Sequence, residues 1–181
     1  NRISLFDLQQ ILQAIVFPSS VPKVQRFGIT EDDRRFLLQY LSQYPPETPY
    51  PKYDDVKFYD SYAKFFFRDS ANPIDRGIRV FNKTGWAYGF LTDVSYVVDF
   101  NHNIEYMLTT TLYVNQDGIL NDGQYEYKET GYPFLYQLGQ LIYQHELGRK
   151  RKVKPDLTGL RLIYEKRDHA DTRPKISEVD N

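Results

Sequence analysis

Residues 78–99 have the sequence IRVFNKTGWAYGFLTDVSYVVD, and the expected fold is built around this segment. It is rich in β-branched and aromatic residues, which favour strands, and Gly89 interrupts it near its middle. We therefore predict two strands joined by a turn that contains Gly89. The first strand is expected to end at Lys83-Thr84-Gly85, and the second to begin near Asp93.

The Lys83-Thr84-Gly85 triplet sets a cation and a hydroxyl beside a residue that has no side chain. On a strand, the ammonium and the hydroxyl can bind a substrate carboxylate through charge-assisted hydrogen bonds, which are about twice as strong as neutral ones. Gly85 leaves space for a ligand to lie against the backbone. The alternative is a plain hairpin in which Lys83 and Thr84 merely face water.

Together with Gly89 and Asp93, this triplet resembles the third motif of the serine β-lactamases and penicillin-binding proteins, whose motifs are Ser-x-x-Lys, Ser-Asp-Asn and Lys-Thr-Gly. More narrowly, residues 82–89 and 114–122 are similar to β-lactamase-related serine hydrolases of Bacteroidetes-type bacteria. The resemblance implies an α+β fold, in which helices flank an antiparallel sheet and the last helix packs across it. It also implies that Lys83, Thr84 and Gly85 line the substrate cleft, and that the Trp86 backbone N–H is an oxyanion-hole donor.

The function implied by the resemblance is acyl transfer by a serine hydrolase, with β-lactam or cell-wall-peptide-like substrates that bear a carboxylate. In that family the nucleophilic serine, its lysine base and Ser-Asp-Asn precede Lys-Thr-Gly. We therefore expect residues 1–146 to be the C-terminal portion of such a domain, inactive alone and incomplete without an N-terminal segment. Residues 147–181 would be a basic and polar extension.

An N-terminal fragment of the same protein or a second copy is the expected partner, and the family implies a periplasmic, exported or cell-surface location.

A literal Ser-x-x-Lys match occurs at Ser61-Tyr62-Ala63-Lys64. On a helix Ser61 and Lys64 would share a face, so that the amine could take the hydroxyl proton. The match lies too close to Lys83 to accommodate a helical domain carrying Ser-Asp-Asn, and the following residues, Phe65–Phe67, indicate a packing element. We interpret it as a decoy; the alternative is an unrelated esterase with a Ser61–Lys64 dyad.

A second hypothesis is a non-catalytic glycan- or protein-binding module that retains the hydrolase-like fold. Trp86 stands where many members of the family carry a small residue, and the chain contains 16 tyrosines. Trp86 and Tyr88 could stack on sugar rings, or they could simply narrow the cleft. Tyr88 is therefore a candidate substrate-binding residue in both hypotheses.

Composition excludes several other classes of protein. Lys and Arg number 23 against 24 Asp and Glu, so no global field attracts nucleic acid, and the basic run at 149–154 is interpreted as a cap on the preceding helix. The absence of an apolar run of about 18 residues excludes a membrane-spanning helix. Cysteine is absent and the three histidines are far apart, so we expect no metal site and no cofactor.

The rest of the chain has clear helical and strand patterns. Ser4 and Thr30 are expected to cap amphipathic helices that end near Pro18 and Pro45. A strand is predicted from Glu105 to Val114. The remaining expectations are a third helix or a mixed segment at 54–67, a closing helix at 132–146 and an edge strand at 159–165.

Overall fold

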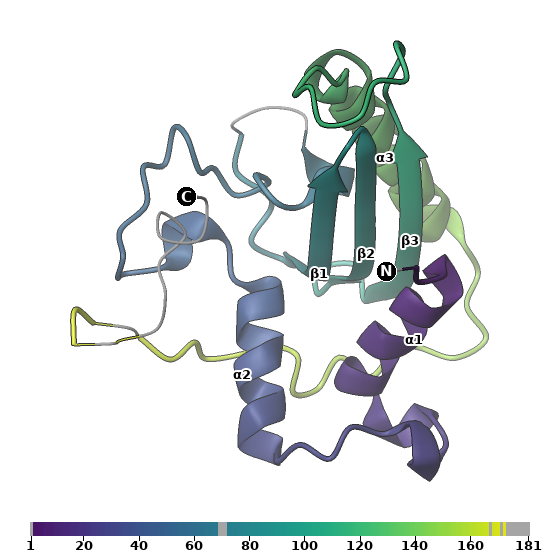
Figure 1. Cartoon of the computed structure of the whole chain (residues 1–181). Coiled ribbons are helices and arrows are strands. Elements are labelled where there is room, and N and C mark those ends of the chain that lie inside the picture. The colour runs from purple at the N-terminus through teal and green to yellow at the C-terminus, as the bar shows by residue number, and fades with distance from the viewer. Residues whose placement is uncertain (1, 69–71, 167, 171, 173–181) are drawn as a thin grey trace.

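The computed structural model describes residues 2–68, 72–166, 168–170 and 172. In this part of the chain, a three-stranded antiparallel sheet of order β1-β2-β3 lies between two layers of helices (Figure 1). The fold is therefore α+β, as predicted. Its strands are β1 (Ile78–Ala87), β2 (Phe90–Asp99) and β3 (Ile104–Tyr113), and its main helices are α1 (Leu5–Val16), α2 (Glu31–Ser42) and α3 (Tyr132–Gly148).

Short helical turns connect these elements. The 3₁₀ helices are η1 (Pro18–Ser20), η2 (Lys23–Gln25), η3 (Pro45–Glu47) and η4 (Phe65–Phe67). A short π-helix, η5 (Tyr127–Gly131), precedes α3. The segment 54–67 is thus mixed and contains no long helix. None of the helices in the described residues is long and apolar enough to cross a membrane.

Two of the three main helices begin at the caps that the sequence predicts. The Ser4 side chain accepts a hydrogen bond from the backbone N–H of Asp7, and Thr30 and Asp33 form a reciprocal capping box. Each cap satisfies backbone donors that a helix N-terminus otherwise leaves without partners, and a cap is typically worth about 1 kcal/mol. These local contacts explain why the starts of α1 and α2 could be predicted.

One hydrophobic cluster fills the space between the sheet and the layer of α1 and α2. It combines residues from these helices, from β1 and β2 and from the chain after α3: Leu12, Val16, Leu38, Phe81, Val94, Tyr96, Val98 and Leu160. The edge strand expected at 159–165 is wrong, because this segment forms no ladder with the sheet and instead inserts Leu160 into the cluster. The end of the extension, residues 173–181, lies outside the described residues.

The opposite face of the sheet is covered by α3 and η4. Ile78, Val80, Val97 and Tyr106 form one cluster there, and a second cluster contains the buried Phe65, Phe66, Leu91 and Leu135. Side chains alternate between the two faces of a strand, so β2 is buried on both sides. The middle strand therefore ties the two helical layers together.

The hairpin between β1 and β2 differs from the sequence-based expectation. The first strand continues past Gly85 to Ala87, and the second begins at Phe90 rather than near Asp93, so the turn contains only Tyr88 and Gly89. Both turn residues have positive φ, 53° at Tyr88 and 85° at Gly89. Two such residues give the tight turn whose twist matches that of the strands, but a tyrosine in the first position conceals this pattern in the sequence.

The tight turn should make Gly89 sensitive to substitution. A Cβ at Gly89 would meet the Asn115 Cβ at 2.6 Å in addition to the strain of a positive φ. We expect Gly89→Ala to lower the free energy of unfolding by about 1–3 kcal/mol, measured by urea denaturation. Gly85→Ala is the matched control, because its Cβ would meet no atom within 4 Å; an equal loss in both variants would contradict this account of the turn.

Candidate functional site

The Lys83-Thr84-Gly85 triplet lies inside β1, which is an edge strand of the described sheet. Its three residues pair with Val94, Asp93 and Thr92 of β2. The triplet is therefore held by a continuous ladder and does not lie in a loop. A rigid strand positions a ligand-binding group more accurately than a loop does.

Lys83 and Gly85 share one face of the sheet. On this face α1 and α2 cover the end near the β2–β3 turn (Figure 1). The Lys83 side chain is exposed, and its Nζ donates to the backbone oxygen of Thr84 at 2.7 Å. Gly85 is exposed and sits opposite Thr92, whose hydroxyl is 2.8 Å from that of Thr111. A ligand on this face would meet an ammonium, an open stretch of backbone and a pair of hydroxyls.

Thr84 and Trp86 point to the opposite face. Thr84 is buried. Of the two side chains that a plain hairpin would place in water, only Lys83 is exposed. Trp86 packs against Phe65, with ring centroids 5.7 Å apart, yet stays 45% exposed. The Lys83 and Thr84 side chains therefore lie on different sides of the sheet. A single ligand could contact Lys83 and the backbone at the edge of β1, but not both side chains.

The backbone N–H of Trp86 faces outward from the edge of the sheet. In a two-residue hairpin the pair that flanks the turn, here Ala87 and Phe90, exchanges hydrogen bonds. The hydrogen-bonding direction alternates along a strand, so the backbone groups of Trp86, and of every second residue from Trp86 back to Ile78, point away from β2. The carbonyls of Ile78 and Val80 agree with this alternation, because they accept hydrogen bonds from the Tyr44 hydroxyl and from Lys64 Nζ. The part of the edge at Ile78 and Val80 is thus covered by side chains, and the Thr84 carbonyl accepts from Lys83 Nζ, whereas the outward groups of Trp86 lie beyond that cover.

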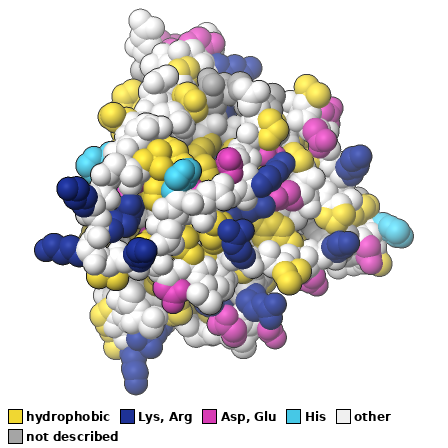
Figure 2. All heavy atoms as spheres, turned by 180° about the vertical axis from the view of Figure 1, so that it is seen from behind, with side chains coloured by type: hydrophobic (Ala, Val, Ile, Leu, Met, Phe, Trp, Pro, Cys, Tyr) yellow, Lys and Arg dark blue, Asp and Glu magenta, His cyan; other side chains and the backbone are white. Residues whose placement is uncertain are grey.

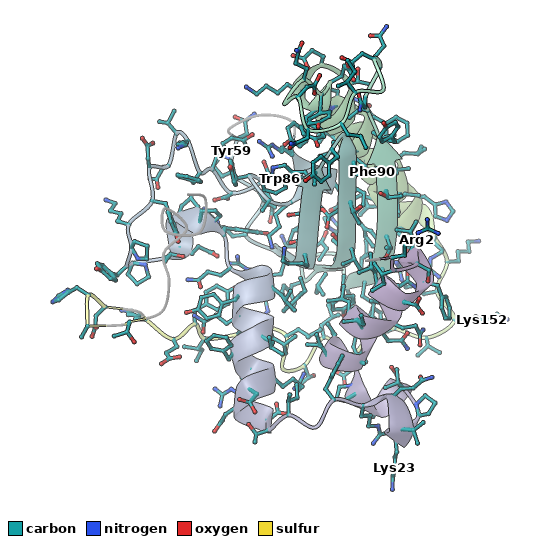
Figure 3. All side chains as sticks on the ribbon, in the orientation of Figure 1. Arg2, Lys23, Tyr59, Trp86, Phe90 and Lys152 are labelled. Carbon is teal, nitrogen blue, oxygen red and sulfur yellow. The ribbon has the colours of Figure 1, made fainter. Side chains whose placement is uncertain are left out.

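Exposed aromatic side chains surround this end of the sheet. Trp86, Tyr88 and Phe90 are each about half exposed, and Phe90 stacks on Tyr113 with ring centroids 4.6 Å apart. Figure 3 shows Trp86 and Phe90 at the same end of the sheet, beside the β1–β2 turn. This end of the molecule therefore offers both hydrogen-bonding groups and flat apolar surfaces.

A buried polar cluster lies directly beneath the triplet, and sequence analysis did not predict it. Lys64 Nζ donates to Asn82 Oδ1 at 2.6 Å, and Asn82 Nδ2 donates to Asp93 Oδ1 at 2.8 Å. Ser95 Oγ and the Phe65 backbone N–H also donate to Asp93. Asn82 thus bridges a buried cation and a buried carboxylate.

Burial governs the ionisation of both charged groups. It lowers the pKa of Lys64, although the nearby Asp93 opposes that shift, and it raises the pKa of Asp93 against the hydrogen bonds from Asn82 and Ser95. The Lys64 ammonium has three donors, and its three acceptors are Asn82 Oδ1 and the backbone oxygens of Leu41 and Val80. The hydrogen bonding is that of a structural ammonium.

The Ser61-x-x-Lys64 match is therefore a packing element, as its neighbouring phenylalanines indicated. Ser61 is fully buried, and it lies in a turn rather than on a helix. Lys64 directs its donors to backbone and asparagine oxygens, so it is not placed as a proton acceptor. These contacts argue against an esterase dyad.

A scan against protein-family models, a search of curated proteins and a search of solved structures each gave no match to the chain.

The buried cluster should be essential for stability. Lys64→Met and Asp93→Asn each remove one side of a buried, hydrogen-bonded charge pair and should lower the free energy of unfolding by about 3–5 kcal/mol, measured with urea. Ser95→Ala removes one donor to Asp93 and should cost only about 1 kcal/mol. A Lys64→Met variant as stable as Ser95→Ala would show that the buried charge pair contributes no more to the free energy of unfolding than a single hydrogen bond.

Proposed function

We propose that this chain forms the substrate-binding edge of a serine hydrolase similar to the β-lactamases and penicillin-binding proteins. The observation that carries the proposal is the place of Lys83-Thr84-Gly85 on an edge strand, with Lys83 exposed and the Trp86 N–H directed outward. The fold is compatible with it, since three antiparallel strands pack against a closing helix, α3.

In this proposal each part of the edge has a separate task. The Lys83 ammonium binds the carboxylate of a β-lactam or a cell-wall-type peptide, and Gly85 lets the substrate approach the backbone. The Trp86 N–H donates to the oxygen that becomes negatively charged during acyl transfer. Tyr88, at the turn, borders the substrate.

The nucleophile has to come from outside this edge. Ser61 and Lys64 are buried in the packing element described above, so we assign acylation to a serine and a lysine outside the described residues. An N-terminal fragment of the same protein or a second copy would supply them, and β3, the other edge of the described sheet, is a natural place for such a partner to pair. A periplasmic, exported or cell-surface location follows from the same proposal.

Removal of the Lys83 ammonium should weaken carboxylate ligands selectively. Trp86 is the single tryptophan of the chain, so its fluorescence reports on this edge directly. For benzylpenicillin, we expect Lys83→Ala to raise the Kd about tenfold, as loss of a hydrogen bond to a charged group does. For the methyl ester of the same compound, which lacks the charge, the Kd should not change.

Lys23→Ala is the matched control, because Lys23 is exposed and lies at the far end of the molecule (Figure 3). It should leave both dissociation constants unchanged. Equal losses for the acid and the ester in Lys83→Ala, or no response of Trp86 to either compound, would overturn the role proposed for this edge.

The exposed aromatic residues favour a second candidate function, a non-catalytic glycan-binding surface. Trp86 in β1 and Tyr88 in the turn are two residues apart in sequence, and half-exposed rings can stack on the apolar faces of sugars. Such binding would depend on ring area rather than on charge. The two functions therefore differ in which variant abolishes them.

If the surface binds glycans, neutral oligomers of glucose or N-acetylglucosamine should quench Trp86 fluorescence. Tyr88→Ala should then weaken binding about three- to tenfold, while Lys83→Ala has no effect. Phe6→Ala, which removes another exposed ring on α1, is the control and should bind normally. Absence of quenching with both sugars would eliminate this candidate.

A further inference from the structure

A cation-lined cleft lies at the other end of the sheet, between the β2–β3 turn and the chain that follows α3. Its volume is about 420 Å³, and its lining includes His102 from the turn and Arg149, Arg151 and Lys154 from the segment after the helix. It adjoins a larger cleft of about 710 Å³ that shares these two arginines and this lysine. Cations from one segment thus face a histidine from another.

Glu146 holds both arginines in place. Its Oε2 atom accepts hydrogen bonds from Arg149 Nε at 2.8 Å and from Arg151 Nη2, and its backbone oxygen accepts from Arg151 Nη1 at 2.8 Å. The last contact confirms that the basic run caps α3. One carboxylate cannot neutralise two guanidinium groups, so a preorganised positive charge remains beside the cleft.

His102 is oriented by a buried carboxylate. Its Nδ1 lies 2.7 Å from Asp99 Oδ2, which also accepts from the Tyr143 hydroxyl at 2.7 Å. Burial opposes ionisation of Asp99, but the hydrogen bonds from Tyr143 and His102 outweigh it and hold the pKa of Asp99 below its ordinary value. Because an ionised carboxylate only accepts, Nδ1 carries the proton and Nε2 is the ring nitrogen left for a ligand.

The local charge is opposite in sign to that of the whole protein. Around the two clefts there are five cations, Arg149, Lys150, Arg151, Lys152 and Lys154, against the four carboxylates of Asp99, Glu105, Glu146 and Asp156. The whole chain has a net charge of −1. In Figure 2, which views the molecule from behind, several Lys and Arg side chains lie at the left margin, which is the side at which Figure 3 labels Lys152 on the right.

We propose that this cleft binds a phosphate group of a small molecule. A phosphate monoester presents three terminal oxygens, which two guanidinium groups and an ammonium can bind together, whereas a carboxylate has only two oxygens to offer. His102 lines the same cleft, and its Nε2 is the ring nitrogen that does not contact Asp99. This site is independent of the edge at Lys83, which lies at the opposite end of the sheet.

Calorimetric titration of the intact chain with inorganic pyrophosphate and with phenyl phosphate tests the proposal. The double variant Arg149→Gln/Lys154→Gln should raise both dissociation constants at least about tenfold, and Arg151 should keep the contact that caps α3. The control Lys23→Gln/Lys52→Gln removes the same charge from exposed positions elsewhere and should change them less than about twofold.

A thermal unfolding midpoint equal to that of the parent chain confirms that the variants are folded, and Lys154→Gln alone replaces the double variant if that one is unstable. Benzoate, which carries a carboxylate in place of the phosphate of phenyl phosphate, should bind at least about tenfold more weakly. Equal weakening in the cleft and control variants, equal affinity for benzoate and phenyl phosphate, or no binding of phosphate by the parent chain would each overturn the proposal.

Discussion

The structure depends most on one buried polar connection, the chain of hydrogen bonds from Lys64 through Asn82 to Asp93. Its members come from the segment before η4, from β1 and from β2, and Lys64 also binds the backbone oxygen of Leu41 in α2. Buried polar groups of this kind are costly unless every member is satisfied. The cluster therefore fixes where the segment before η4 and the end of α2 can lie against the sheet.

The same cluster determines where the sheet is open. Side chains of Lys64 and Tyr44 occupy the outward carbonyls of β1 at Val80 and Ile78, so a ligand cannot reach this part of the edge. The two strands then continue past the cluster to the tight turn, and the groups around Gly85 are left exposed on a rigid ladder. The first part of β1 thus packs against the rest of the protein, and the part near the turn is left accessible to a ligand.

Local patterns made much of the fold predictable, and non-local contacts limited the rest. Ser4 and Thr30 marked two helix starts because a cap involves residues three apart, and the composition of residues 105–114 marked a strand. The extent of the hairpin was missed because Tyr88 is an unusual residue at positive φ. The triplet at Lys83 could be found as a local motif, whereas the role of Lys64 rests on Leu41 and Asn82, to which no spacing rule points.

The path of the chain after α3 shows why a cationic cleft forms where it does. α3 packs on one face of the sheet, while Leu160 belongs to the cluster on the opposite face, so the intervening residues must pass round the sheet beside β3 (Figure 1). This crossing segment is the basic run, and it passes the β2–β3 turn with His102. Because Glu146 anchors the run at its start and Leu160 anchors the chain beyond it, the cations are held between two fixed points. A segment tied at both ends loses less conformational entropy when it binds a ligand than a free tail does, which favours binding at this place over a purely solvated cap.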